Sequence, residues 1–426
     1  MKTLYPKSLE SLREHVKTHI PTLYVMSKTS TVIAYDLLSE SLSEQCIVDL
    51  SSLPSKIKLD GEDLSISGAV TWQDAIDFLK GTDREIMTYP TDKSACVLAG
   101  LATSCTGEMA FGYGTFRQQV IECEYMDYKG EVNKLTHKDH IIDKNYKELT
   151  DKYKFFKNPP MPRFDRECDL MIGTEGQLGI ITSAKIKTTP QQAYTCLFIK
   201  LPKWEVDFRA HLEIVEQVQN YRDKIRICEF LDSNSLTYLK DPLFEDLDLI
   251  VLEVKESELE YIFENFLMNL KHISDEDIFE INRSKFLALR VEIPRNVNET
   301  NARSGVVKKG TDAQVRIEDF EKLMEFYRSW SKLGIKYNLF GHLGDCHLHF
   351  NFNPGQAEVK TVEKELLKFY HLISSLKGSP FAEHGIGIVK QAFIKNYHTE
   401  TVKALFKKLK VKHDPKDQFF PSGWLS

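Results

Sequence analysis

The chain has no closely spaced pair of cysteines. Its eight cysteines stand apart, at positions 46, 96, 105, 123, 168, 196, 228 and 346, with no Cys-x-x-Cys among them. Iron–sulfur clusters and zinc ribbons need such pairs, so the scatter excludes their common forms. Scattered thiols are typical of a reducing compartment. We therefore expect a cytoplasmic protein without an iron–sulfur cluster of its own.

The chain also has no excess of positive charge. The net charge at pH 7 is −6, and the sequence has no dominant basic patch that could neutralise phosphates. We therefore expect no binding of nucleic acid. Near the C-terminus there is a single cationic cluster, formed by Lys403, Lys407, Lys408, Lys410 and Lys412. Its spacing predicts the solvated face of a helix and leaves peripheral membrane contact open.

Long hydrophobic runs are the third absence. No apolar stretch is long enough to cross a bilayer, and Met1–Pro6 is not followed by a signal-peptide hydrophobic region. The sequence predicts no transmembrane segment. Its 426 residues, 42% of them hydrophobic, are enough for two domains with ordinary cores.

Hydrophobic periodicity predicts an α+β architecture with a domain boundary near Pro190. Before the boundary we expect helices at 9–19 and 72–79, and strands at 22–26, 46–50, 64–70, 119–128 and 131–135. After it we expect strands at 193–200, 226–231 and 248–254, and helices at 208–221, 256–270, 317–330 and 360–376.

Two stretches rich in small residues favour a bound nucleotide. Residues 95–114 are dense in Gly, Ala, Ser and Thr, and Gly173, Gly176 and Gly179 recur at a spacing of three. Small residues let the backbone approach a ligand and present its amides. Tight packing explains the glycine triplet alone equally well, but the two stretches together favour a nucleotide cofactor.

Two short histidine-bearing segments carry the most chemistry. They lie at 341–350 and 382–385, and their polar residues are His342, Asp345, His347, His349, Glu383 and His384. Imidazole and carboxylate are the usual ligands of divalent transition metals, and a further histidine can move a proton. One histidine beside a glycine is usually structural. Four on two glycine-flanked segments predict a metal or substrate site.

Alternation after Cys346 predicts a strand with His347 and His349 on a polar face, outside the hydrophobic core. His342 lies an odd number of residues before His349, so an unbroken strand would point the two apart. A turn at Gly344–Asp345 is therefore expected to bring both to one site.

Five ordered motifs carry a family resemblance over nearly the whole chain. They are Ile47–Ser51, Val70–Trp72, Ala99–Glu108 with Tyr113–Thr115, Gly173–Thr182, and Gly341–Asp345 with Glu383–Gly387. With them the chain resembles the FAD-linked 2-hydroxy-acid dehydrogenases of the vanillyl-alcohol-oxidase type. That family includes D-lactate dehydrogenase, D-2-hydroxyglutarate dehydrogenase and the flavin subunit of glycolate oxidase.

The resemblance implies a two-domain α+β fold. Residues 1–190 would form the FAD-binding domain and residues 191–398 an α+β substrate cap with a metal site, while residues 399–426 would return to the FAD domain. The first loop holds no histidine or cysteine for a covalent link, so the FAD is expected to be non-covalent.

Site residues also follow from the resemblance. His342, His349 and Glu383 match metal ligands, for zinc, manganese, iron or cobalt. His384 matches the catalytic base, Arg290 an arginine that binds the substrate carboxylate, and Lys309 (or Lys308) a second basic contact. The residues implied to bind the cofactor are Ser27, Lys28, Thr29, Ser30, Thr31, Pro90, Gly100, Thr103, Ser104, Gly107, Tyr113, Gly114, Gly173, Glu175, Gly176, Gly179 and Ile180.

One departure from the family stands in the first cofactor loop. Residues 24–31 contain no glycine, where the family is glycine-rich. Hydroxyls and the Lys28 charge remain to hold a phosphate, but β-branched residues such as Thr29 and Thr31 disfavour a positive φ. The departure motivates the hypothesis of weakened FAD affinity.

The implied reaction is FAD-dependent oxidation of a D-2-hydroxy acid of the D-lactate, D-2-hydroxyglutarate or glycolate type to the 2-oxo acid. Electrons would pass on to a partner protein, a quinone or oxygen. Two alternatives stay open. One is a flavoenzyme for a different alcohol, altered by His347, where the family often has asparagine. The other is a flavin-poor subunit of an oxidase complex, which the glycine-free loop favours and the intact metal set opposes.

Overall fold

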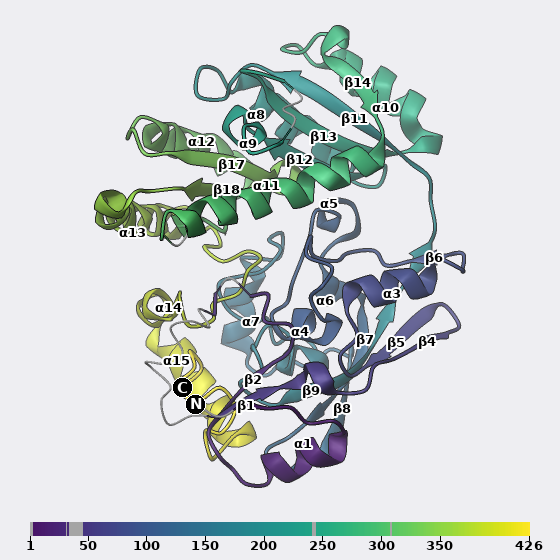
Figure 1. Cartoon of the computed structure of the whole chain (residues 1–426), viewed down its shortest axis with the longest axis vertical. Coiled ribbons are helices and arrows are strands. Elements are labelled where there is room, and N and C mark those ends of the chain that lie inside the picture. Colours follow the sequence, from purple (N-terminus) through teal and green to yellow (C-terminus); the bar gives the residue numbers. More distant parts are fainter. Residues whose placement is uncertain (1–2, 31, 34–45, 241–243, 307–308) are drawn as a thin grey trace.

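The chain forms two domains and a C-terminal tail that returns to the first of them (Figure 1). The computed structural model describes residues 3–30, 32–33, 46–240, 244–306 and 309–426. We call residues 3–190 the first domain, 191–379 the cap and 380–426 the tail. No helix in these described ranges is both long enough and apolar enough to cross a membrane.

The first domain is built on two sheets, and β6 and β10 form a third, two-stranded antiparallel one. A five-stranded antiparallel sheet has the order β4-β5-β9-β7-β8, and a parallel sheet has the order β1-β3-β2. The strands are β1 (Thr3–Leu4), β2 (Thr22–Val25), β3 (Cys46–Asp49), β4 (Lys56–Asp60), β5 (Asp63–Ser67), β6 (Arg84–Glu85), β7 (Val120–Met126), β8 (Val132–Thr136), β9 (Ile180–Lys187) and β10 (Thr189–Pro190). The helices are α1 (Leu9–Val16), α3 (Trp72–Leu79), α4 (Val97–Ala102), α5 (Ala110–Tyr113), α6 (Phe116–Gln119) and α7 (Lys144–Asp151).

Local sequence signals set the start of α3. The Thr71 hydroxyl accepts a hydrogen bond from the Asp74 amide, and the Asp74 carboxylate accepts one from the Thr71 amide. This reciprocal pair satisfies two amides that the helix leaves without partners. The buried residues Trp72, Ala75 and Leu79 then form one face against the core.

The cap is an eight-stranded sheet covered on both faces. Its order is β14-β11-β13-β12-β17-β18-β15, with β16 also paired to β18. The strands are β11 (Tyr194–Leu201), β12 (Ile225–Leu231), β13 (Asp248–Lys255), β14 (Ile278–Ile281), β15 (Lys309–Gly310), β16 (Ala313–Gln314), β17 (Tyr337–His342) and β18 (His347–Phe352). The helices are α8 (Arg209–Val218), α9 (Ser233–Leu236), α10 (Leu259–Asn265), α11 (Arg283–Arg303), α12 (Ile317–Ser331) and α13 (Val359–Ser375).

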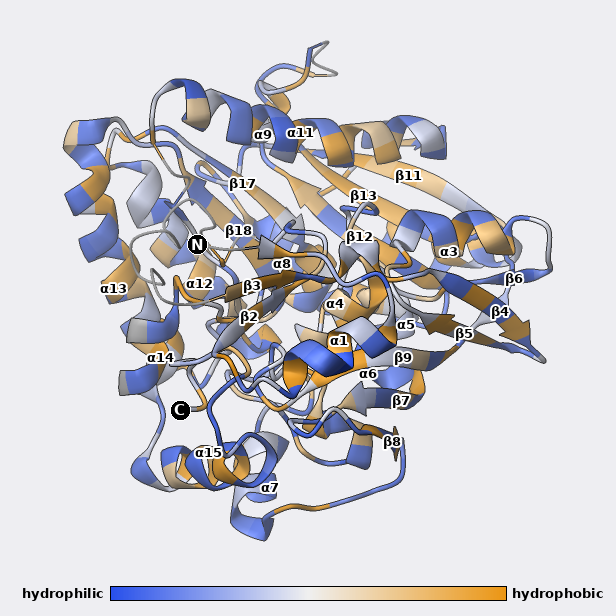
Figure 2. Ribbon diagram, turned by 60° about the horizontal axis from the view of Figure 1, so that its bottom comes forward, coloured by the Kyte–Doolittle hydropathy of each residue, from blue (hydrophilic) through white to orange (hydrophobic). Residues whose placement is uncertain are grey.

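Alternation along the cap strands divides their side chains between two cores. In β11, Leu197 and Ile199 pack with residues of α8, α12 and α13, whereas Cys196 and Phe198 pack with α11. Both faces of a strand are therefore buried, and its sequence is almost continuously apolar. Figure 2 shows this apolar sheet inside polar helix surfaces.

Helix α11 is the main element that hydrophobic periodicity did not predict. It contains Pro294, which removes a helix hydrogen bond and costs about 3 kcal/mol in a helix interior. Phe286, Leu289, Ile293 and Val297 are buried at helical spacing against the sheet. Burial of four such side chains, each worth roughly 1.5–3 kcal/mol, outweighs the cost of the proline.

The polar face of β18 is also buried, contrary to the expectation from alternation. All six residues of the strand are buried, and His347 is 0% exposed. The reason is that this face meets the tail, through contacts such as that of His349 with Glu383. Sequence alternation showed which side chains share a face but not what covers them.

The tail joins the first domain earlier than expected. Phe381, Ile386 and Ile394 already belong to the hydrophobic core of the first domain, together with Val402 and Phe406. The expected cap boundary at 398 is therefore too late, because the chain leaves the cap near residue 380. Helices α14 (Gln391–Tyr397) and α15 (Glu400–His413) follow, and both termini lie beside the first domain (Figure 1).

Lys410 was expected on a solvated helix face but is 5% exposed. Its Nζ donates to the Gln177 and Phe419 carbonyls, at 3.0 and 2.6 Å, and pairs with Asp414 at 2.7 Å. The ammonium therefore fastens the tail to the glycine segment at 173–179. The lysines at 407 and 408 are exposed, as predicted.

We expect Lys410→Met to lower the free energy of unfolding by roughly 3–5 kcal/mol, because it leaves the buried Asp414 carboxylate without its cation. Chemical denaturation followed by tryptophan fluorescence measures this change. The matched control is Lys407→Met on the exposed face of the same helix, which should change stability little. Equal stability of the two variants would contradict the anchoring role of Lys410.

Candidate active site

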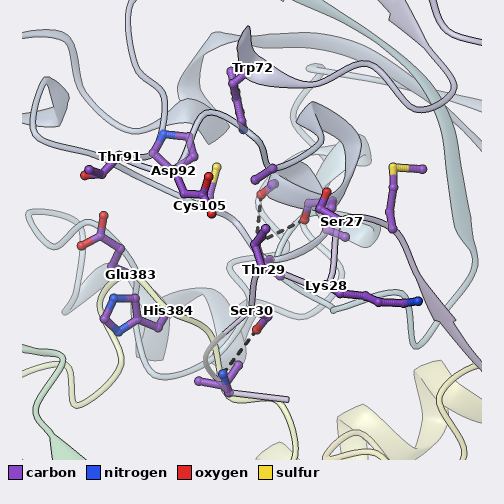
Figure 3. Close-up of a pocket in the computed structure, with 18 of the residues that line it drawn as sticks. Ser27, Lys28, Thr29, Ser30, Trp72, Thr91, Asp92, Cys105, Glu383 and His384 are labelled. Atoms are coloured by element: carbon purple, nitrogen blue, oxygen red, sulfur yellow. Dashed lines mark hydrogen bonds between the residues drawn. The ribbon is translucent and has the colours of Figure 1, made fainter. Parts of the chain in front are cut away.

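A cavity of about 950 Å³ separates the first domain from the cap. The first domain contributes the loop at 26–30, helix α4 and the segment at 175–181; the cap contributes α11, His342 and His349. Glu383 and His384 of the tail complete the lining. Figure 3 shows those two side chains on the opposite side of the cavity from Ser27–Ser30. The cavity lies at the upper end of the size range of small-molecule sites, as a dinucleotide requires.

Most of the residues implied to bind the cofactor reach this cavity. The lining includes Ser27, Lys28, Thr29, Ser30, Pro90, Gly100, Thr103, Glu175, Gly176, Gly179 and Ile180. It does not include Ser104, Gly107, Tyr113, Gly114 or Gly173. Thr31 lies outside the described residues. Eleven of the predicted cofactor-binding residues therefore line the cavity, and their role in binding stays a prediction.

Packing and hydrogen bonds explain the identity of some residues of the small-residue tract that do not line the cavity. A Cβ on Gly107 would lie 2.0 Å from the Tyr89 carbonyl oxygen, and one on Gly112 would lie 2.8 Å from the Arg226 Cα in β12. The Tyr113 hydroxyl contacts Glu85 and Tyr194 instead of the cavity. Part of the small-residue tract therefore serves close packing, including contact between the first domain and the cap sheet.

The glycine-free loop still reaches the left-handed backbone region. Lys28 adopts φ 57°, a conformation that usually favours glycine. Its Nζ pairs with Asp49 at 2.6 Å, and the Ser27 hydroxyl accepts from the Cys96 amide at 2.6 Å. These contacts hold the loop against β3 and α4. The unbranched Lys28 therefore takes the positive φ, and Thr29 does not.

A tight hairpin builds the histidine cluster. Strands β17 and β18 pair so that His342 lies opposite His347, and the turn at Leu343–Asp345 ends with Cys346 at φ 52°. A Cβ on Gly341 would lie 3.0 Å from the His347 carbonyl oxygen and 3.1 Å from the His349 ring. Glycine at 341 therefore allows the histidines to approach one another. The expected turn at 344–345 is present.

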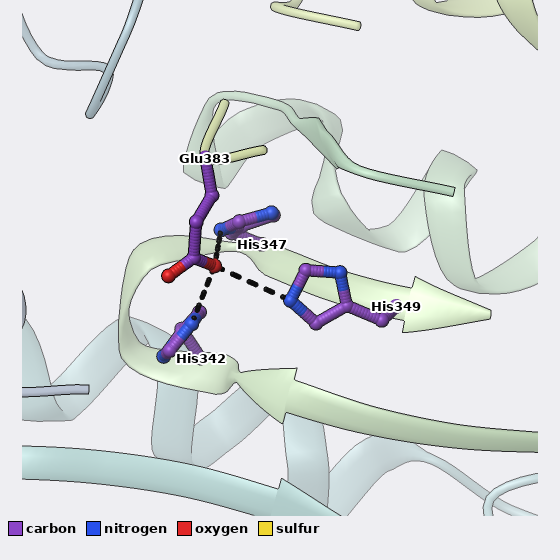
Figure 4. Close-up of side chains that lie close together, drawn as sticks. All are labelled: His342, His347, His349 and Glu383. Atoms are coloured by element: carbon purple, nitrogen blue, oxygen red, sulfur yellow. Dashed lines mark hydrogen bonds and ion pairs between the residues drawn. The ribbon is translucent and has the colours of Figure 1, made fainter. Parts of the chain in front are cut away.

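Three imidazoles converge on one carboxylate, as Figure 4 shows. The Glu383 Oε2 atom lies 2.9 Å from His342 Nε2, 3.4 Å from His349 Nε2 and 4.0 Å from His347 Nδ1. All four donor atoms lie within 4.8 Å of one another. A cluster of imidazole nitrogens with a carboxylate oxygen suits a divalent transition metal. The three histidines are buried, with His342 only 3% exposed, and His342, His349 and Glu383 border the cavity.

An acceptor orients the far nitrogen of each ring. His342 Nδ1 lies 2.6 Å from Glu229, His349 Nδ1 lies 3.2 Å from the Thr311 carbonyl, and His347 Nε2 lies 3.1 Å from Asp312. A ring proton donated outward leaves the lone pair of the other nitrogen facing the cluster. This is the usual outer arrangement of metal-binding histidines.

Opposite charges in the cluster shift the pKa values of His342 and Glu383. Burial opposes a proton on His342, but Glu229 and Glu383 outweigh it and raise the pKa of His342 to about 9. Burial also opposes ionisation of Glu383, yet His342 and Lys157 hold the pKa of that carboxyl well below its usual range. A cation is therefore favoured between the two carboxylates, and a metal ion supplies one as well as a proton does.

A second group of donors lies next to the first, formed by Asp312, His349 and His384. Asp312 Oδ2 already contacts Lys390 Nζ at 3.0 Å and the His384 amide at 2.9 Å. The lysine ammonium occupies the place that a cation would need. Only the first group is therefore suited to a metal.

His384 is placed to accept a proton. Its ring stacks on His349, with centroids 5.0 Å apart, and its side chain is 37% exposed toward the cavity. The side chain is exposed only to the cavity, and desolvation by the surrounding protein lowers the pKa of His384 to about 4, which leaves the imidazole neutral at pH 7. Asp312 lies 3.6 Å from Nδ1 and stabilises the ring once it is protonated. A neutral imidazole with such a partner can accept a proton, and the carboxylate favours the protonated ring.

Arg290 lies in the cavity wall and is held by two carboxylates. Its Nη1 pairs with Glu229 at 2.8 Å and its Nη2 with Glu108 at 3.4 Å. Nη2 also donates to the Thr91 hydroxyl at 3.2 Å. Lys309, in contrast, pairs with Glu363 on the cap surface and does not line the cavity. The structure thus does not bring Lys309 to the site, and Lys308 lies outside the described residues.

Sequence reasoning missed Glu229, Asp312 and Lys157. Glu229 and Asp312 hold histidine rings, and Lys157 lies 3.4 Å from Asp345 and is 4% exposed. Lys157 has no neighbouring motif that could have revealed it. Glu229 and Asp312 stand in strand-like stretches where their burial beside histidines depends on the pairing of β12, β16, β17 and β18.

The fold and site together define a two-domain flavoprotein oxidoreductase. Residues 4–136 match the family described as FAD binding domain, and residues 207–422, half of the chain, match FAD linked oxidases, C-terminal domain. The chain belongs to the FAD-linked oxidase family. The vanillyl-alcohol-oxidase-type fold and the FAD cofactor implied by the sequence motifs are confirmed.

Curated relatives share this family. D-lactate dehydrogenase [cytochrome], mitochondrial, of Kluyveromyces lactis is 24% identical over 97% of this chain and 71% of its own length. D-2-hydroxyglutarate dehydrogenase, mitochondrial, of Arabidopsis thaliana is 29% identical, but the match spans 58% of this chain and under half (46%) of that protein. D-lactate dehydrogenase of Archaeoglobus fulgidus is 22% identical over 89% of this chain and 81% of its own length.

Among solved structures, an alkyldihydroxyacetonephosphate synthase superimposes with a TM-score of 0.68 at 14% identity. The match covers 99% of this chain and 75% of that one. At this identity the likeness concerns the fold alone.

If the cavity holds FAD, filling it should abolish flavin binding. Ala99 on α4 is partly exposed in the cavity wall. We expect Ala99→Phe to remove the yellow flavin absorption of the purified protein, because the ring occupies cofactor space. Ala404→Phe, on the exposed face of α15, is the control and should stay yellow. Undiminished flavin absorption in Ala99→Phe would contradict this placement.

Proposed function

We propose that this protein oxidises a D-2-hydroxy acid to the 2-oxo acid with FAD as the hydride acceptor. One observation carries the proposal: the His342, His349 and Glu383 donors and the neutral His384 imidazole all border the same cavity as the loop at 26–30. Relatives named as D-lactate and D-2-hydroxyglutarate dehydrogenases support the substrate class. The anaerobic mixing experiment described below distinguishes D-lactate, D-2-hydroxyglutarate and glycolate as substrates.

Bound FAD would lie between the loop at 26–30 and the segment at 175–180, and it would take up the hydride that leaves C2 of the substrate. A divalent metal held by His342, His349 and Glu383 would act as a Lewis acid and lower the pKa of the 2-hydroxyl group. Zinc, manganese, iron and cobalt all suit this donor set.

Protein side chains accept the proton and bind the substrate carboxylate. His384 accepts the hydroxyl proton on a ring nitrogen, and Asp312 stabilises the resulting imidazolium at 3.6 Å. Arg290 binds the substrate carboxylate through Nη2 while Nη1 keeps its contact with Glu229. His384 borders the same cavity as the metal donors, so the hydroxyl proton has an acceptor beside the reacting carbon.

The proposal also covers the electron acceptor of the reduced flavin and the cellular location of the protein. We infer an acceptor outside the chain, which is a partner protein, a quinone or oxygen. Seven of the eight cysteines are buried and form no disulfide, which supports a reducing, cytoplasmic location (Cys96, Cys105, Cys123, Cys168, Cys196, Cys228 and Cys346).

Anaerobic mixing with a D-2-hydroxy acid tests the reaction directly. We expect the oxidised flavin bands to bleach with a D-acid but not with its L-enantiomer. His384→Gln should keep the flavin but slow bleaching roughly 100- to 10,000-fold, because the general base is lost. His371→Gln, on the exposed face of α13, is the control. A flavin that stays oxidised with every hydroxy acid tried would refute the proposal.

Metal removal tests the Lewis-acid role. Dialysis against a strong chelator should leave the flavin bands unchanged while the rate of their bleaching by substrate falls. Addition of one equivalent of manganese or cobalt should restore the rate. Full activity in protein shown to be metal-free by elemental analysis would exclude a metal from the reaction.

A further inference from the structure

The feature that stands apart from the resemblance is the third histidine of the cluster, His347. The family often has asparagine there. In this chain the ring is 0% exposed, on β18 opposite His342. The resemblance assigned His347 no definite role, and its surroundings in the structure now define one.

One nitrogen of His347 is held and the other is not. Nε2 lies 3.1 Å from Asp312 Oδ1, which fixes the ring proton on Nε2. Nδ1 is buried and has no hydrogen-bond partner in the described part of the chain. A buried polar atom without a partner costs free energy, so an inert packing role leaves Nδ1 unexplained.

Nδ1 faces the metal cluster. It lies 4.0 Å from Glu383 Oε2 and within 4.8 Å of the donor nitrogens of His342 and His349. His342 and His349 show the same pattern, with one nitrogen held from outside by Glu229 or Thr311 and the other aimed inward. His347 thus has the position, the tautomer and the outer carboxylate of a metal ligand.

We propose that His347 is a fourth protein ligand, so that this chain binds its metal through three histidines and Glu383. This inference rests on the metal site of the proposed function and extends it. Neighbouring ligand atoms around a six-coordinate ion lie about 3.0 Å apart, and opposite ones about 4.2 Å, at bond lengths near 2.1 Å. The separations of 2.9, 3.4 and 4.0 Å from Glu383 Oε2 are of the size that ligand atoms of one ion show.

The fourth ligand restricts the metal. Catalytic zinc keeps three protein ligands and an open fourth position, whereas four protein ligands around tetrahedral zinc would leave no place for substrate. A six-coordinate ion with four protein ligands leaves two positions, enough for the hydroxyl and one carboxylate oxygen of a 2-hydroxy acid. The site therefore favours manganese, iron or cobalt over tetrahedral zinc.

X-ray absorption of the wild-type flavoprotein loaded with cobalt tests the ligand count without any substitution. We expect three imidazoles in the fitted shell and the weak visible bands of six-coordinate cobalt. Two imidazoles, or the intense bands of tetrahedral cobalt, would overturn the proposal.

Variants of His347 test the ligand count through the affinity of the protein for cobalt. His347→Asn keeps a polar group for Asp312 but removes the imidazole, and we expect cobalt binding to weaken roughly 100-fold or more, beyond the usual effect of losing an outer-shell partner. His347→Gln should behave alike, and His371→Asn should bind as wild type does. Flavin absorption and the thermal midpoint report correct folding.

The outcomes separate this inference from the proposed function. If His342→Asn abolishes cobalt binding while His347→Asn binds normally, only the fourth ligand is refuted. If the wild-type protein binds no cobalt, manganese, iron or zinc, the metal site of the proposed function fails as well.

Discussion

The site depends on the convergence of three buried imidazoles on one oxygen of Glu383. This carboxylate comes from the tail, whereas the histidines come from a hairpin of the cap. Buried charges are tolerated only when they are paired, so the cap and the tail cannot separate here without exposing or orphaning a charge. The same contact closes the cavity opposite the first cofactor loop. One electrostatic cluster thus joins the cap to the tail at the wall of the cavity.

Outer partners give this cluster its chemistry. Glu229 contacts both His342 and Arg290, and Asp312 contacts His347, the His384 amide and Lys390. Burial alone would raise the pKa of Asp312, but His384, Lys390 and His347 hold it well below its ordinary range. An ionised Asp312 therefore orients His347 and lies beside His384. In the proposed reaction, this one aspartate would serve both the metal site and the proton acceptor.

Sequence alone predicted the parts whose signals are local. The alternation of β18, the turn before it and the start of α3 at Thr71 are all encoded within a few residues. Features that depend on contacts between distant segments were not predicted. They are the burial of the β18 polar face, the burial of Lys410 and the carboxylates around the histidines. Helix α11 escaped for another reason, because Pro294 is a local breaking signal that tertiary burial overrides.

The first cofactor loop shows how a sequence departure can be accommodated. Glycine is favoured where φ is positive, yet the structure gives that conformation to Lys28 and secures it through Asp49. Burial opposes ionisation of Asp49, but Lys28 and Ser51 outweigh it and lower the pKa of that carboxyl, so the pair stays charged. The strain of a left-handed lysine is modest compared with that of a β-branched residue, and the ion pair offsets part of it. The absence of glycine in this loop therefore gives no structural reason to expect a flavin-free protein. The expected weakening of FAD affinity depends instead on how well the Ser27 and Ser30 hydroxyls replace backbone approach to the cofactor phosphates.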